Sequence, residues 1–304
     1  MNRKGFEFSF AWLFAILVGA VVIFLAIYAT TSLIGSGRYE TDTKIAAQLE
    51  SILSPVGTNL EDSKFVRIGF PDETRIYNRC SSIGIFGSQL ISTSVRSGIG
   101  KEWLPPGGEI ESKDKYVFSK SVLQGEEAYV FVKSFEMPYD VADIITIYSG
   151  EYCFINPGDE IEEEVMDLRL PGINISESLE KCKPESIKVC FSSFDRDCDK
   201  KVSQTDVDGL YYEEGLVYAA IFSDAEVYEC QVRRLIKRTS ELAEIYAKKS
   251  EFLAGKGCSS NLAGDLGRYS SLLGEFENSG DLRVVKSNSE EIEDKNERLS
   301  CELF

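Results

Sequence analysis

The segment 195–206 places acidic side chains at spacings that suit a metal ion. Aspartates occupy its first, third, fifth and twelfth positions, and a serine occupies the ninth. Calcium takes about six to eight oxygen ligands from carboxylates, carbonyls and hydroxyls. The segment therefore predicts a Ca²⁺ site with the ligands Asp195, Asp197, Asp199, the Lys201 carbonyl, Ser203 and Asp206.

This segment resembles the calcium loop of EF-hand proteins, and more closely the dockerin variant, which ends in aspartate. Two features favour another interpretation. Lys200 stands where such loops use a glycine for their sharp turn. The flanking segments 187–191 and 209–212 have the composition of strands rather than helices. The alternative is an acidic β-turn held by Cys198.

Motifs for catalysis are absent from the sequence. The chain has no histidine, which excludes Ser–His and Cys–His nucleophiles. It also lacks the phosphate-binding, dinucleotide-binding and nucleophile-elbow motifs. Carboxylates such as those of 160–164 suit glycoside hydrolysis when two are correctly separated, but a solvated helix face explains this run more simply. We expect no enzymatic activity, and no cofactor besides the candidate Ca²⁺.

Eight cysteines follow a long uncharged segment, residues 8–37. An even number of cysteines in an exported region indicates disulfides, although eight allow about 105 pairings. With no histidine and no C-x-x-C pair, a zinc site is disfavoured.

The uncharged segment predicts a membrane span. A helix needs about 20 apolar residues to cross a bilayer. Arg3 and Lys4 precede the segment, which by the positive-inside rule keeps the N-terminus in the cytoplasm. The prediction is a single-pass protein of the cell membrane, with residues 1–5 cytoplasmic, residues 6–34 in the lipid bilayer and the rest extracytoplasmic. The alternative is a cleaved secretory signal, whose apolar core is shorter, about 7–15 residues.

Lys4-Gly5-Phe6 before a long apolar helix resembles the processing site of archaeal type IV pilins. The resemblance implies cleavage between Gly5 and Phe6 and assembly through the apolar helix. Pilins carry a glutamate five residues into the mature chain, where this sequence has Phe10. The layout also resembles uncharacterised single-pass exported membrane proteins of small-genome archaea.

A stem helix is predicted for residues 35–60. Within it, the apolar residues Ile45, Leu49, Ile52 and Leu53 repeat at helical spacing. We expect this apolar face to pack on the protein's own β-rich region.

Residues 61–223 form the predicted β-rich region, an antiparallel sheet punctuated by glycine and proline. The clearest hairpin joins 115–121 to 127–134, and two further strands are expected at 186–192 and 210–222. Asn174 belongs to the one N-x-S/T sequon and falls in a predicted loop, 171–185, which makes it a glycosylation candidate.

Residues 224–304 are predicted to be helical. One helix begins at a capping box, 223–226, and ends at Gly255. A second covers about 260–277, and a third is capped by 287–290. Because the links are short, the helices should form an antiparallel bundle. This arrangement brings Cys258 close to Cys301 and predicts a disulfide between them. The fold class is therefore α+β.

The exported part carries 31 basic and 49 acidic residues, a net charge of −18. Such a surface repels phosphate backbones, so nucleic acid is not an expected partner. We expect a membrane-anchored extracytoplasmic protein with a binding or structural role at the cell envelope, towards a protein or envelope partner that the sequence does not identify. The alternative is a pilin-like subunit processed after Gly5.

Overall fold

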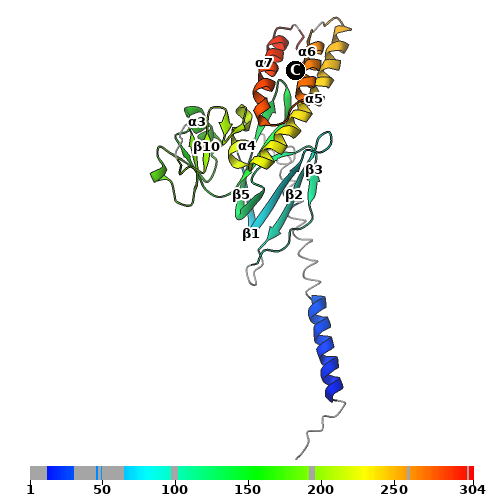
Figure 1. Ribbon diagram of the computed structural model, residues 1–304, viewed down its shortest axis with the longest axis vertical. Coiled ribbons are helices and arrows are strands. Elements are labelled where there is room, and N and C mark those ends of the chain that lie inside the picture. Colours follow the sequence, from blue (N-terminus) through cyan, green and yellow to red (C-terminus); the bar gives the residue numbers. More distant parts are fainter. Residues whose placement is uncertain are drawn as a thin grey trace, which may run out of the picture.

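The computed structural model describes residues 12–30, 46, 49, 65–96, 102–191, 196–258, 261–299 and 301–304. Within these residues, the N-terminal helix Trp12–Thr30 is the one helix long and apolar enough to cross a membrane. It projects away from the part that we call the head, residues 65–304 (Figure 1). Gly5, Phe6 and most of the stem 35–60 lie outside the described residues.

The first sheet has six strands in the order β3-β2-β1-β5-β6-β4. They are β1 (Val66–Ser81), β2 (Ser88–Val95), β3 (Ile110–Ser112), β4 (Tyr116–Phe118), β5 (Val122–Glu136) and β6 (Asp140–Tyr148). Every neighbouring pair is antiparallel except β4 with β6. The prediction of a hairpin between 115–121 and 127–134 is wrong. The β4 strand pairs in parallel with β6, and β5 pairs with β1 and β6.

The two faces of this sheet bury different clusters. Alternating residues of β1, β2, β4, β5 and β6 form one apolar cluster, which includes Leu49 of the stem. Ala46 and Leu49 are helical and buried, at 0% and 2% exposure. The burial of these two residues, the ones that the structure describes in the stem, agrees with the predicted packing of the stem on the β-rich region. The opposite face carries Tyr116, Phe118 and Phe131 in the cluster that the C-terminal helices cover.

A second sheet corrects the prediction of a wholly antiparallel region. Its order is β12-β11-β10-β9-β7-β8. The strands are β7 (Tyr152–Ile155), β8 (Ile173–Ser176), β9 (Ile187–Phe191), β10 (Lys200–Val202), β11 (Asp206–Val207) and β12 (Leu210–Tyr211). The β8, β7, β9 and β10 strands are mutually parallel. Crossovers through α3 (Asp159–Leu168) and the short helix η1 (Leu179–Lys181) make this possible.

Residues 210–222, predicted as a strand, form β12, the short helix η2 (Glu214–Leu216) and α4 (Val217–Phe222). Every residue of α4 is buried. A short, fully buried apolar run has no periodicity that separates a strand from a helix, which explains the error.

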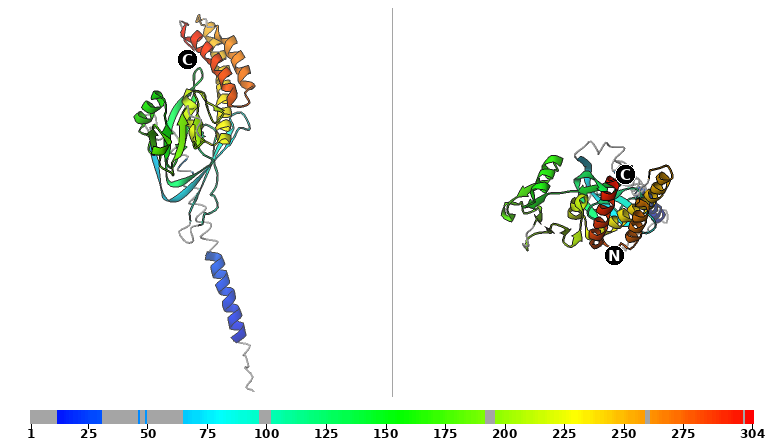
Figure 2. Two further views of the ribbon diagram at one scale, coloured as in Figure 1. Left: turned by 60° about the vertical axis from the view of Figure 1, so that its left-hand side comes forward. Right: turned by 90° about the horizontal axis from the view of Figure 1, so that it is seen from above.

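Three longer helices follow: α5 (Ala225–Ala254), α6 (Leu262–Gly274) and α7 (Leu282–Glu297). They stand together at the end of the head farthest from the N-terminal helix (Figure 2). The predicted capping box at 223–226 is not formed, because the helix begins one residue later than predicted, with Asp224 rather than Ser223 at the N-cap. The Asp224 carboxylate accepts hydrogen bonds from the backbone and hydroxyl of Ser121. The third helix begins earlier than predicted, after the short helix η3 (Ser279–Asp281), which Asn278 caps.

All eight cysteines are paired. The helix arrangement predicted Cys258–Cys301, and these residues are joined, with Cα atoms 6.1 Å apart. The other disulfides are Cys80–Cys230, Cys153–Cys182 and Cys190–Cys198. Two of them lie within the second sheet and its loops, whereas Cys80–Cys230 joins the end of β1 to α5.

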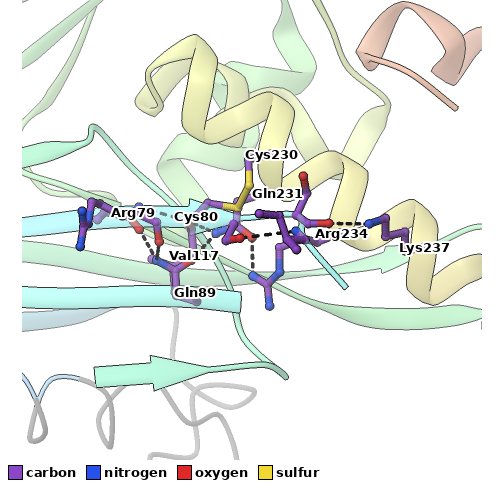
Figure 3. Close-up of a disulfide and its surroundings, with 12 residues drawn as sticks. Arg79, Cys80, Gln89, Val117, Cys230, Gln231, Arg234 and Lys237 are labelled. Carbon is purple, nitrogen blue, oxygen red and sulfur yellow. Dashed lines mark hydrogen bonds between the residues drawn. A yellow bond between two sulfur atoms is a disulfide. The ribbon is translucent and has the colours of Figure 1, made fainter. Parts of the chain in front are cut away.

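A buried polar network holds α5 on the first sheet beside Cys80–Cys230 (Figure 3). Arg234 is fully buried, and its guanidinium lies 4.8 Å from the ring centroid of Tyr116. It donates to the carbonyls of Phe86, Lys113 and Lys115 and to the Gln231 side chain. Gln231 in turn donates to Gln89 and to the Val117 carbonyl. One arginine therefore satisfies carbonyls from two separate connections of the sheet.

The first prediction concerns this arginine. Arg234→Met keeps much of the apolar stem but removes the guanidinium that donates to three carbonyls, in one buried hydrogen bond, to Lys115, and two part-buried ones. The free energy of unfolding should fall by about 3 kcal/mol or more. Urea unfolding of the full chain in detergent, with disulfides intact, measures this loss. Arg298→Met is the matched control: Arg298 is 78% exposed and pairs only with Asp294, so a change below about 0.5 kcal/mol is expected. Equal losses in the two variants would contradict the role given to Arg234.

Candidate binding groove

The described members of the predicted calcium segment are engaged in a β-turn. Asp206 accepts hydrogen bonds from the Ser203 hydroxyl and the Gly209 amide. The Lys201 carbonyl accepts from the Asp208 amide. Asp199 accepts from the Lys188 amide, and Cys198 is bonded to Cys190. Asp195 lies outside the described residues.

The residue at the glycine position of the loop motif also has a structural role. The Lys200 ammonium donates to the Ser223 and Ala220 carbonyls at the end of α4. Burial lowers the pKa of this lysine. Within the described part of the chain, no cluster of three or more carboxylates or cysteines could hold a metal ion. This geometry favours the acidic β-turn over the Ca²⁺ site.

The end of this segment lines an open groove of about 1010 Å³. One wall is α3, and the opposite wall is formed by 202–205 and 212–213, with Lys133 and Lys286 entering from β5 and α7. Apolar side chains also line the groove, and we call them its floor: Ile161 and Leu168 of α3 with Phe191, Val202 and Val217. Ser203 is the one predicted site residue that the structure places in this groove.

The side chains of α3 give the groove its charge. Glu160, Glu163, Glu164 and Asp167 lie at helical spacing and all line it. Glu164 forms an ion pair with Lys133. Glu160, Glu163 and Asp167 have no cationic partner among the residues that the structure describes. Three carboxylates of one helix face therefore stand uncompensated above an apolar floor.

Both lysines of the groove are already neutralised within it. Lys133 pairs with Glu164, and Lys286 pairs with Glu213 at 2.7 Å. The Glu213 side chain is 19% exposed, and its burial raises the pKa of the carboxyl despite the opposing effect of Lys286. A ligand that enters the groove thus meets net negative charge.

A buried hydroxyl lies behind the wall formed by α3. Tyr218 is fully buried, and its hydroxyl makes no hydrogen bond of standard geometry. Burial and the neighbouring carboxylate of Glu164 raise the pKa of this tyrosine. Lys133 lies 5.3 Å from the centroid of its ring.

The groove continues into a second hollow of about 480 Å³ along α7. Lys133, Glu213 and Lys286 line both, and the extension adds Glu136, Glu290 and Glu293. Burial and the surrounding carboxylates raise the pKa of Glu293. Together the two hollows form an extended acidic channel with apolar sections.

From the sequence, a solvated helix face is the preferred interpretation of the acidic run 160–164, and a binding groove is not predicted there. The helical spacing of these carboxylates predicts that they share one face of α3. It does not predict the groove, because the opposite wall comes from segments more than 30 residues away in the sequence. The structure places Asn174 on the exposed edge strand β8, not in the predicted loop 171–185, and it remains a glycosylation candidate.

No protein-family model, no curated protein and no solved structure matches this chain.

The second prediction uses the raised pKa of Glu213. A carboxyl whose folded pKa exceeds its unfolded value stabilises the fold in acid, and this contribution is lost as the pH rises through the folded pKa. Glu213→Gln removes the ionisation, so the variant does not lose stability as the pH rises. The variant should therefore be more stable than the wild type at pH 7, and the difference should vanish below the ordinary glutamate pKa of 4.5. Urea unfolding between pH 4 and pH 8 measures the difference.

Lys286→Met is the companion variant. It leaves the Glu213 carboxylate buried without its partner, so stability at pH 7 should fall. If both variants change the free energy of unfolding in the same direction at pH 7, burial is not the main cause of the raised pKa of Glu213.

Proposed function

We propose that this protein is a single-pass membrane protein whose extracytoplasmic head binds a partner at the cell envelope. The observation that carries the binding role is the acidic groove: three uncompensated carboxylates above an apolar floor, beside two lysines that the chain neutralises itself. Such an arrangement destabilises the free protein slightly through like-charge repulsion, and a cationic ligand relieves that repulsion.

Two observations support the location of the head. The helix Trp12–Thr30 has the length and composition of a membrane anchor. Four disulfides are typical of a compartment that is oxidising, outside the cytoplasm. Arg3 and Lys4 before the helix favour a cytoplasmic N-terminus and an exported head.

The chemistry of the groove defines the partner. Carboxylates select a cationic group, and the floor of Ile161, Phe191 and Val217 selects apolar side chains. We infer a protein segment that carries both, since an extended channel of this kind exceeds what a single ion fills. A binding role also agrees with the lack of catalytic motifs in the sequence.

The third prediction tests the groove as a contact site. A photo-crosslinking amino acid at Gln204, an exposed residue of the groove, should give a discrete adduct in native membranes. The same probe at Glu251, exposed on α5 outside the groove, is the control. Glu160→Lys with Glu163→Lys should reduce the Gln204 adduct at least about tenfold. Equal adducts at both probe positions, or no effect of the charge reversal, would contradict a specific binding role.

A pilin-like subunit is the second candidate, and one observation favours it. Ala46 and Leu49 are helical and buried, and Leu49 packs in the apolar cluster of the first sheet, which is how a pilin stem packs on its head. The Lys4-Gly5-Phe6 sequence supports the same candidate. In that case the apolar helix leaves the bilayer and forms the centre of a filament.

The fourth prediction separates the two candidates by the N-terminal sequence and intact mass of protein extracted from native membranes. We expect the chain to keep residues 1–5, because Phe10 replaces the glutamate of the pilin pattern. A chain that begins at Phe6 would make filament assembly the leading function. A chain that begins after the apolar helix would instead identify a cleaved signal.

A further inference from the structure

The connection between β1 and β2 exposes apolar side chains at the surface of the head. Ile83 is 87% exposed, Ile85 65% and Phe86 39%. No other large apolar side chain in the described residues is as exposed as Ile83. A contiguous apolar group at the surface of a protein usually marks a site of interaction. We call residues 82–87 the apolar tip.

The apolar tip is held in one conformation by α5. The Lys237 ammonium donates to the carbonyls of Ser82 and Gly84, and the Arg234 guanidinium donates to that of Phe86. Gly87 has a φ of +59°, and a Cβ there would lie 2.2 Å from the Ser81 carbonyl oxygen. The Cys80–Cys230 disulfide anchors the strand that leads into the tip (Figure 3). Because the tip is ordered before it binds, little conformational entropy is lost on association.

The cations behind the tip are not neutralised by ion pairs. Arg234 and Lys237 donate only to carbonyl and amide oxygens, and no carboxylate lies at ion-pair distance from either among the described residues. The tip thus presents apolar side chains beside the part-exposed ammonium of Lys237, with the fully buried Arg234 guanidinium behind them. The groove presents the complement, an apolar floor below the unpaired carboxylates of Glu160, Glu163 and Asp167.

We propose that the apolar tip of one copy of this chain binds in the acidic groove of a second copy. This inference rests on the proposed binding role of the groove and names its partner. In Figures 1 and 2, α3 lies on one side of the head, and β2 with the preceding tip lies on the other. The contact is therefore between copies. Because two different surfaces meet, each copy keeps a free tip or a free groove, and the association continues as a head-to-tail row.

A charge exchange between two tagged copies of the full chain, co-expressed in native membranes, tests the proposal. Ile83→Glu places a carboxylate on the tip, and this exposed position should tolerate it. We expect co-purification of the two copies to fall at least about tenfold when both carry Ile83→Glu. Pairing an Ile83→Glu copy with a Glu160→Lys, Glu163→Lys copy should restore it, because the introduced charges attract. Ile245→Glu, at an isoleucine 58% exposed on α5, is the matched control and should leave association unchanged.

The Gln204 photo-adduct separates failure of this inference from failure of the binding role. An adduct of two copies of the chain, with the second crosslinked within 82–87, is the expected result. An adduct with a different protein would overturn self-association and keep the groove as a binding site. No adduct at Gln204 would overturn both. Association that Ile83→Glu leaves unchanged, or that the exchanged charges do not restore, would also overturn the tip-in-groove contact.

Discussion

The attachment of α5 to the first sheet depends on one buried guanidinium. Among the residues that the structure describes, no carboxylate pairs with Arg234 to offset its desolvation, so the positions of the Phe86, Lys113 and Lys115 carbonyls matter to its stability. Those carbonyls lie in the connection after β1 and the turn before β4. The position of α5, the conformation of the apolar tip and the path into β4 are therefore fixed together. The Cys80–Cys230 disulfide reinforces the same junction.

For binding, the distribution of charged residues over the head matters more than the net charge of the chain. The chain carries a net charge of −17, yet the two cations nearest the apolar tip face only uncharged oxygens. On α3 the reverse holds, because within the described part of the chain Glu164 is the one groove carboxylate of α3 that pairs with a lysine. An excess of acidic residues over the whole surface keeps unrelated surfaces apart. Against this background, an apolar projection backed by Lys237 and an acidic groove with apolar lining are distinct.

Local sequence patterns predicted the elements better than their partners. The apolar span, the three C-terminal helices and the Cys258–Cys301 pair follow from periodicity and short links. The segments 115–121 and 127–134 are adjacent and both have strand composition, so a hairpin was predicted between them. The prediction failed because β4 pairs instead with β6, a partner more distant in the sequence that local patterns do not identify. Parallel pairing in the second sheet likewise depends on crossovers through α3 and η1, which no single segment reveals.

The groove could not be predicted from the sequence, because it too depends on long-range contacts. Its walls come from β5, α3, the 202–213 region and α7, and only the fold brings these together. The calcium hypothesis came from a correct observation, the regular spacing of acids in 195–206. In the structure, Lys200 at the glycine position donates to carbonyls at the end of α4, and Asp199 and Asp206 accept hydrogen bonds from the chain itself.

The disulfides also determine how the head responds to mechanical load. A pull between the N-terminal helix and the last helix enters through β1 and crosses directly to α5 through Cys80–Cys230, which spans 150 residues of sequence. It then crosses from the end of α5 to the end of α7 through Cys258–Cys301. The second sheet, α3 and the groove lie on the bypassed length of chain. A head strained at the cell surface would thus keep its groove intact while the load passes along α5.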